Sequence, residues 1–175
     1  SGVDVQIGSQ IGELAPMRAA FEKTIGLVKF LREAGHDLHR IDLGGGLGIP
    51  YQDGDRPATP ADYAQMIREV TEGLGLQVIL EPGRVIAGNA GVMVSEVLYH
   101  KPAPDRTFLI IDAGMNDLMR PALYQAHHDI IPVQEAPAEA ANTTYDIVGP
   151  ICESTEKFAA QREMPEVAAG KRIAY

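Results

Sequence analysis

The first half of the chain alternates between short apolar runs and longer segments with helical periodicity. Apolar runs at residues 3–7, 40–43 and 76–80 predict three strands, because runs of this length between turn residues are typical of buried strands. Residues 14–34 carry apolar side chains at helical spacing and are followed by Gly35, which predicts a helix. Strands that alternate with helices predict a parallel sheet covered by helices.

A second helix is predicted to begin at residue 59. Thr59 suits the N-cap, Pro60 suits the first helical turn, and an acid, Asp62, follows three residues after the cap. Apolar residues then recur at helical spacing at Tyr63, Met66, Ile67, Val70 and Leu74. The helix therefore fills the interval between the second and third predicted strands.

Beyond residue 85 the pattern changes to mostly β. Extended segments are expected at residues 91–99, 107–112, 123–133 and 144–148. An Ala-, Glu- and Pro-rich loop is expected at 134–142, and one or two helical turns are expected around 154–161. The change in pattern predicts a domain boundary within residues 85–104.

Composition narrows the class of protein. A chain of 175 residues makes one domain or parts of two, and it is too short for a complete (β/α)₈ barrel of about 250 residues. The 24 acidic residues exceed the 15 basic ones, which argues against a nucleic-acid-binding surface. No apolar run approaches the roughly 18 residues of a membrane span. Cys152 is the only cysteine, so no internal disulfide can form, and a reducing, cytoplasmic location is expected.

Glycine or polar residues follow each of the three predicted strands. They are Gly8 and Ser9, the glycine-rich run at residues 44–48, and Glu81 with Arg84. The carboxyl ends of parallel strands meet at one edge, where ligands bind, so we expect a shared anion site there. The run at 44–48 fits neither the dinucleotide fingerprint nor the P-loop. Taken singly, the glycine run could be a flexible turn, and Glu81 with Arg84 an ion pair.

The second half offers two further candidate segments. Residues 112–117 follow an apolar strand, and Arg120 and Tyr124 lie four residues apart just beyond. Cys152 and Glu153 lie in a tight turn after Gly-Pro. Each has a plainer alternative, an ordinary loop for the first and a small buried thiol for the second.

No metal site is predicted. His127 and His128 are adjacent, so on a strand they would point to opposite faces. His36 and His39 lack the thiol or carboxylate partners of a zinc site. The nucleophile elbow of serine hydrolases is also absent from the sequence.

Five segments together resemble the diaminopimelate decarboxylase family, within the fold-type III decarboxylases that use pyridoxal 5′-phosphate (PLP). In family order they are Ile-Gly-Ser-Gln at 7–10, Asp-Leu-Gly-Gly-Gly-Leu-Gly at 42–48, Glu-Pro-Gly-Arg at 81–84, Asp-Ala-Gly-Met-Asn-Asp-Leu-Met-Arg-Pro-Ala-Leu-Tyr at 112–124, and Gly-Pro-Ile-Cys-Glu-Ser at 149–154. The resemblance implies an α/β fold in which residues 1–90 are the last three strands of a PLP-binding (β/α)₈ TIM barrel. Residues 91–175 would be part of a mostly β C-terminal domain. The chain would be an internal segment of a longer enzyme.

The resemblance also implies a set of cofactor-binding residues: Ser9, Gly44, Gly45, Gly46, Glu81, Pro82, Gly83 and Arg84. Ser9 and the glycine backbone would hold the phosphate. Glu81 would face the pyridine nitrogen and keep it protonated.

The implied substrate is meso-2,6-diaminopimelate, and the implied product is L-lysine. Arg84, Arg120 and Tyr124 would bind the carboxylate at the non-reacting end, which a planar guanidinium matches. Glu153 would pair with the distal ammonium, and Cys152 would reprotonate the substrate carbon. In the family these last two residues come from the partner subunit, which implies a homodimer.

Two departures from the family pattern leave alternatives open. Gln6 stands where the family has a histidine that stacks on the cofactor ring, and an amide cannot replace an aromatic face. The lysine that holds the cofactor lies in a family segment with no counterpart here. The lysines present are Lys23, Lys29, Lys101, Lys157 and Lys171. The alternatives are a catalytically dead relative that binds PLP or an amino acid, and a decarboxylase of the ornithine or arginine type. We expect no decarboxylation from the 175-residue chain alone.

Overall fold

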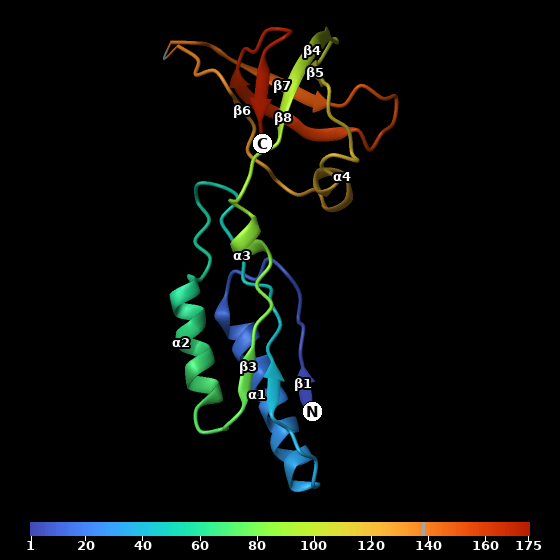
Figure 1. The fold of residues 1–175 in the computed structure, drawn as a ribbon. Coiled ribbons are helices and arrows are strands. Elements are labelled where there is room, and N and C mark those ends of the chain that lie inside the picture. Colours follow the sequence, from blue (N-terminus) through green and yellow to red (C-terminus); the bar gives the residue numbers. More distant parts are fainter. Residues whose placement is uncertain (138) are drawn as a thin grey trace. The chain divides into compact units, whose positions relative to one another are not determined.

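A computed structural model describes residues 1–137 and 139–175 and divides the chain into two compact units (Figure 1). Unit 1 is Ser1–Gly91 and unit 2 is Val92–Tyr175. Unit 1 contains the strands β1 (Gly2–Asp4), β2 (Arg40–Asp42) and β3 (Gln77–Ile79) and the helices α1 (Leu14–Glu33), α2 (Pro60–Thr71) and α3 (Arg84–Ala87). The three strands are parallel and neighbour one another in the order β1-β2-β3. The predicted strands and both long helices are confirmed, although each strand is only three residues long.

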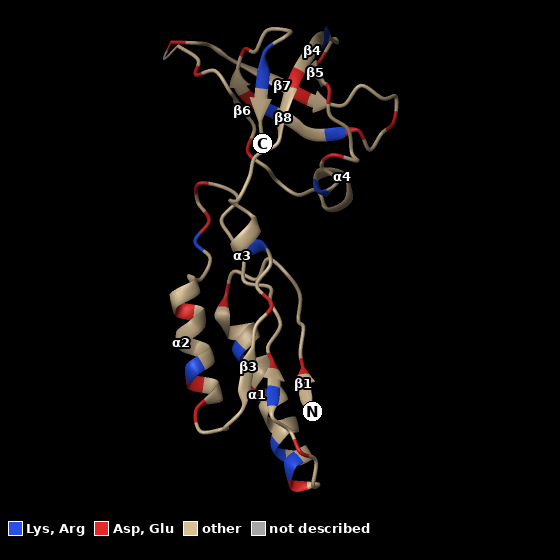
Figure 2. Cartoon of the chain, in the orientation of Figure 1, with Lys and Arg blue, Asp and Glu red and all other residues tan. Residues whose placement is uncertain are grey.

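The two long helices cover the same face of the three-stranded sheet. Phe21 of α1 and Met66 of α2 are buried in one core with Ile41 of β2. Arg18 of α1 also forms an ion pair with Glu69 of α2, and Figure 2 shows charged residues on both helices. Side chains alternate along a strand, so the residue after Ile41 lies on the opposite face, which the helices leave uncovered.

Helix α2 begins with the predicted capping box. The Thr59 hydroxyl accepts a hydrogen bond from the Asp62 amide at 3.1 Å, and the Asp62 carboxylate accepts one from the Thr59 amide at 3.1 Å. The Thr59 hydroxyl also donates to this carboxylate at 2.6 Å. The hydrogen bonds from the Thr59 side chain, and then from its backbone, lower the pKa of Asp62.

Unit 2 is a mixed six-stranded sheet. Its elements are β4 (Val94–Pro102), β5 (Thr107–Ile111), α4 (Arg120–Tyr124), β6 (Ile131–Pro132), β7 (Asn142–Val148), β8 (Lys157–Pro165) and β9 (Arg172–Ala174). The strand order is β6-β9-β4-β5-β7-β8, and only the β5–β7 pair is parallel. Val97, Leu109, Ile111, Tyr145 and Ile147 lie at the centre of its core.

Two sequence-based expectations in unit 2 are wrong. Within residues 123–133, expected as a strand, the chain instead completes α4 and forms only the short strand β6; Gln125 ends the helix with a φ of 51°. Residues 154–161, expected as helical turns, lead into β8, because β7 supplies backbone partners along its length. The expected loop at 134–142 includes residue 138, which lies outside the described residues. Among the described helices, none is long and apolar enough to cross a membrane.

Candidate functional site

In unit 1, the segments that follow the three strands meet at one edge of the sheet. The Glu81 amide donates to the Gly44 carbonyl at 2.8 Å, which joins the segment after β3 to the glycine run after β2. The Ile11 amide donates to the Gly46 carbonyl at 2.9 Å, which joins the segment after β1 to the same run. The glycine run therefore lies between the other two segments.

The glycine run is tightly packed. A Cβ atom at Gly45 would overlap the Glu81 carbonyl, and one at Gly46 would overlap the Gly8 carbonyl. Gly46 also has a φ of 100°, which favours glycine. Gly45 is buried, and no described residue accepts a hydrogen bond from its amide. A flexible turn is therefore the wrong description of this run, and the run presents a backbone donor that has no acceptor among the described residues.

Gln10 connects this edge to Arg84. Its side chain bonds the backbone of Ile49 twice, donating to the carbonyl at 2.6 Å and accepting from the amide at 3.2 Å. Its Oε1 also accepts from Arg84 Nη1 at 3.0 Å. The Arg84 guanidinium lies 5.8 Å from the centre of the Tyr51 ring. In the described part of the chain no salt bridge joins Arg84 to Glu81, so that alternative is not observed. Sequence reasoning gave Gln10 no role, because its partners lie about 40 and 74 positions away.

Three carboxylates gather beside this edge. One oxygen each of Asp4, Asp42 and Glu81 lie within 4.8 Å of one another. Asp42 Oδ1 also accepts from the Gly44 amide at 2.9 Å. Like charges this close are favoured only when a positive charge or a proton lies among them.

The remaining predicted cofactor residues lie in the same loops. Ser9 is exposed between Gly8 and Gln10, and Pro82 is exposed after Glu81. The Gly83 carbonyl accepts from the amides of the last two residues of α3, Ile86 and Ala87, at 3.0 Å each.

Behind the glycine run lies a cavity of about 340 Å³ with largely apolar walls. It is lined by Gly44, Gly45, Leu47, Pro60, Tyr63, Ala64, Leu80, Pro82, Val85 and Ile86. The Tyr63 hydroxyl is buried and has no hydrogen-bond partner among the described residues. Burial, and then the nearby Asp42 charge, raise the pKa of Tyr63.

In unit 2, the predicted substrate residues lie on α4 and on the loop between β7 and β8. Arg120 Nη1 lies 3.2 Å from His128 Nε2, and the Tyr124 side chain is exposed. Cys152 is exposed, so the alternative of a small buried thiol is wrong. Glu153 is also exposed, and its carboxylate accepts from the Ser154 amide at 2.9 Å.

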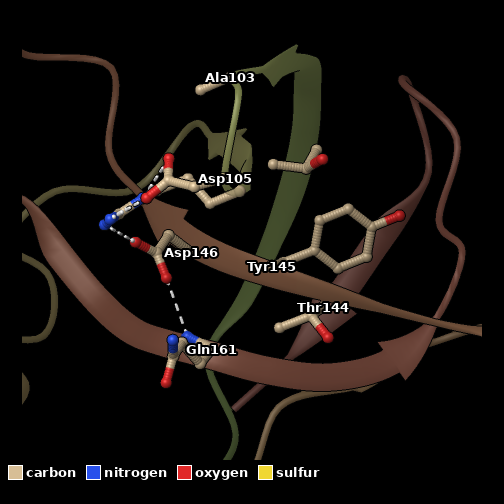
Figure 3. Close-up of a pocket in the computed structure, with 8 residues that line it drawn as sticks. Ala103, Asp105, Thr144, Tyr145, Asp146 and Gln161 are labelled. Carbon is tan, nitrogen blue, oxygen red and sulfur yellow. Dashed lines mark hydrogen bonds and ion pairs between the residues drawn. The ribbon is translucent and has the colours of Figure 1, made fainter.

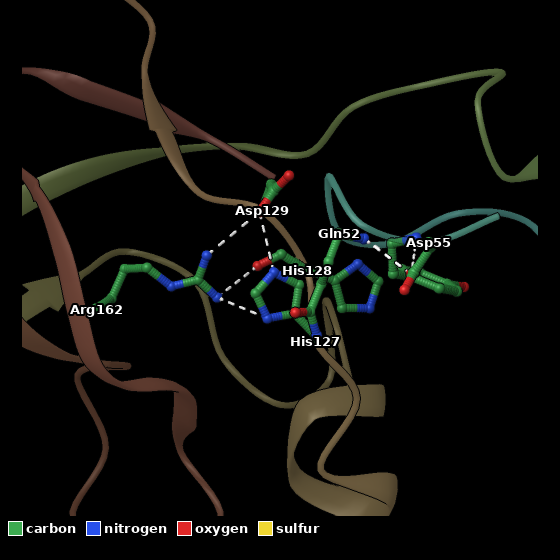
Figure 4. A network of polar contacts seen from close by, with 7 residues as sticks. Gln52, Asp55, His127, His128, Asp129 and Arg162 are labelled. Carbon is green, nitrogen blue, oxygen red and sulfur yellow. Dashed lines mark hydrogen bonds and ion pairs between the residues drawn. The ribbon is translucent and has the colours of Figure 1, made fainter.

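A polar network fixes the segment that follows α4 (Figure 4). Arg162 of β8 donates to the His128 carbonyl at 2.9 Å and lies 3.3 Å from His127 Nδ1. His127 Nε2 lies 2.9 Å from Asp129 Oδ1. The segment is thereby tied to the sheet through Arg162.

The comparisons with known proteins agree with one another. The family model described as "Pyridoxal-dependent decarboxylase, C-terminal sheet domain" matches residues 8–175. The diaminopimelate decarboxylase of Aquifex aeolicus is 43% identical over 173 residues, 99% of this chain and 41% of the relative. That of Pseudomonas aeruginosa is 46% identical over 163 residues, 93% of this chain and 39% of the relative.

A solved structure is also similar to the chain. Diaminopimelate decarboxylase from Helicobacter pylori, complexed with L-lysine, superposes with a TM-score of 0.89 at 40% identity, covering 99% of this chain and 42% of that one. The chain thus spans about two fifths of the length of the relatives that it matches. The family match begins inside unit 1, so the sheet-domain description is not confined to unit 2. On these matches, the chain belongs to the pyridoxal-dependent decarboxylase family.

Proposed function

We propose that this chain is part of a PLP-dependent decarboxylase that converts meso-2,6-diaminopimelate to L-lysine and CO₂. The observation that carries the proposal is the meeting of Glu81, the glycine run and the Gly8 segment at the carboxyl ends of three parallel strands. The names of the relatives, and the L-lysine in the H. pylori structure, support this choice of substrate.

The proposal assigns residues 1–90 to the last strands of a (β/α)₈ barrel and residues 91–175 to part of the C-terminal β domain. Both long helices lie on one face of the parallel strands, and carboxylates lie beside the carboxyl edge. A doubly wound sheet would have helices on both faces, whereas a barrel has them only outside. The other strands of the barrel would correspond to the part of the relatives that lies outside the match to this chain.

The residues of unit 1 fit PLP in two respects. The buried Gly45 amide has no described acceptor and can donate to a phosphate oxygen. Gly44 and Gly46 are its chain neighbours, and Ser9 lies on the segment that contacts Gly46. Glu81 belongs to a group of three carboxylates that a protonated ring nitrogen would help to neutralise. When bound, PLP supplies a sink for the electron pair left by the departing CO₂.

The substrate contacts divide between the two units. Arg84, Arg120 and Tyr124 would bind the distal carboxylate, and Glu153 would pair with the distal ammonium. Cys152 would donate a proton to the carbon that loses CO₂. We propose that Cys152 and Glu153 act in the active site of the partner subunit of a homodimer.

The test measures product formation by the full-length protein with PLP. We expect L-lysine from meso-2,6-diaminopimelate, little turnover of L-ornithine or L-arginine, and a raised KM in Glu153→Gln. Glu163→Gln, which changes an exposed glutamate of β8, is the matched control and should behave as wild type. Preference for L-ornithine would refute the choice of substrate. PLP binding without turnover of any of the three would refute the enzymatic proposal in favour of a catalytically dead relative.

A further inference from the structure

Glu156 is a buried carboxylate in unit 2 that none of the proposed roles uses. It is only 8% exposed, although it immediately precedes β8 and follows the exposed Cys152 loop. Both of its carboxylate oxygens accept from the Met115 amide, at 3.2 and 3.3 Å. A side chain of one loop thereby holds the backbone of another, 41 positions away.

Two glycines make room for this carboxylate. A Cβ atom at Gly149 would overlap Glu156 Oε2, and one at Gly114 would lie 3.1 Å from the same oxygen. Gly149 opens the Cys152 loop and Gly114 precedes α4, so each loop contributes one glycine. A larger residue at either position would displace the carboxylate.

The backbone on both sides of Glu156 is also fixed. Its carbonyl accepts from the Gly149 amide at 2.9 Å and its amide donates to the Glu153 carbonyl at 3.1 Å, which closes the loop that carries Cys152. On the other side, the Gly114 amide donates to Asp117 Oδ2 at 2.8 Å, three residues before Arg120. Each loop is thus held by its own hydrogen bonds, and the Glu156 side chain links the two loops to each other.

We propose that Glu156 is a positioning residue that couples the α4 segment, which carries Arg120 and Tyr124, to the loop that carries Cys152 and Glu153. This proposal rests on the proposed function. In the proposed dimer, the α4 segment serves the subunit's own active site and the loop serves that of its partner. One buried carboxylate then sets the geometry of both active sites.

Hybrid dimers of the full-length protein separate the two contributions. In a dimer of a Glu156→Ala subunit with a Glu81→Ala subunit, the one competent site takes its α4 segment from the Glu156→Ala chain. In a dimer of Glu156→Ala with Cys152→Ala, the one competent site takes its cysteine loop from the Glu156→Ala chain. The reference hybrids carry wild type in place of Glu156→Ala, and Glu163→Ala is the matched control.

We expect a raised KM in the first hybrid and a lowered kcat in the second, each up to about 100-fold, because small misplacements of reacting groups are costly. Glu156→Gln keeps an oxygen that can accept from Met115 and should restore most of the activity. A defect confined to one hybrid, or unchanged kcat and KM per PLP-loaded site in both, would overturn the proposal.

A second measurement does not depend on activity. Hydrogen exchange at the Met115 amide and alkylation of the exposed Cys152 thiol should both accelerate in Glu156→Ala and stay as in wild type in Glu163→Ala. If the Met115 amide exchanges at the wild-type rate in Glu156→Ala, the coupling is refuted even in an active enzyme. If the wild-type protein yields no L-lysine while both rates rise as expected, it is the proposed function that fails.

Discussion

Asp146 of β7 is a buried carboxylate whose removal should loosen the β7–β8 pair. Its Oδ1 accepts from the Gln161 amide at 2.8 Å, and its Oδ2 lies 3.2 Å from Arg106 Nη1. Figure 3 shows Asp146 directed toward Gln161. Both residues line a cavity of about 230 Å³. Gln161 has a φ of 48°, so the carboxylate holds β8 where its backbone is irregular.

The expected loss of stability in Asp146→Ala follows from the exposure of the two side chains in the ion pair. The Asp146 side chain is 6% exposed and that of Arg106 is 49% exposed. Breaking a fully buried ion pair costs about 3–5 kcal/mol, and water around Arg106 compensates for part of that. We therefore expect Asp146→Ala to destabilise the β7–β8 pair by about 2–3 kcal/mol, including the unpaired Gln161 amide.

The assay is a double-mutant cycle on the full-length protein, read by hydrogen exchange at the backbone amides that pair β7 with β8. Arg106→Ala, Asp146→Ala and the double variant should give a coupling energy of about 1–2 kcal/mol. Asp105→Ala, which removes the exposed partner of Arg106, is the control and should cost under about 1 kcal/mol. Additivity of the two substitutions to within roughly 0.5 kcal/mol would refute the reasoning.

Four further predictions concern unit 1. Thr59→Ala should lower the free energy of unfolding by about 1 kcal/mol, measured by urea unfolding followed by circular dichroism. Ser1→Ala, at an exposed serine, is the control, and an equal decrease there would count against a role of the capping box. The capping box lowers the pKa of Asp62 below 3.8, so the stability that the Asp62 carboxylate adds is present above that pH and is lost as the pH falls below it. Asp62→Asn should therefore have a smaller free energy of unfolding than wild type at pH 7, and a difference of the same size at about pH 2 would contradict this. Gly45→Ala should weaken PLP binding in an absorbance titration, whereas Gly54→Ala, where a Cβ meets nothing within 4 Å, should not. Gln6→His should tighten PLP binding, and unchanged affinity would mean that ring stacking at this position is unimportant.

The two long helices of unit 1 could be predicted because their signals are local. The capping residues of α2 and the apolar stripe of α1 lie within one or two turns of the residues that they organise. In unit 2 the deciding interactions are distant. Strand β8 is specified by its pairing with β7, and α4 ends within the first residues of the segment expected as a strand. Local pattern cannot decide such segments, because tertiary contacts override propensity.

The candidate site could also be predicted only where it depends on strand order. Parallel strands bring their carboxyl ends together, so the meeting of Gly8, the glycine run and Glu81 follows from the strand order alone. Gln10 and Glu156 were not predictable in this way. Each acts through the backbone amide of a residue about 40 positions away, and no spacing along the chain encodes such a contact.

The glycine run shows how the structure changes the meaning of a sequence pattern. Consecutive glycines suggest freedom of the backbone, yet Gly45 and Gly46 are each packed against a carbonyl of a neighbouring segment with no room for a side chain. The neighbours fix this backbone, so the Gly45 amide keeps one direction, and none of the residues that the structure describes accepts from it. A donor fixed before a ligand arrives loses little entropy on binding. In the proposed function, tight packing would be what suits this edge of the sheet to a phosphate. Gly45→Ala should then weaken PLP binding by moving Glu81 rather than by stiffening a loop.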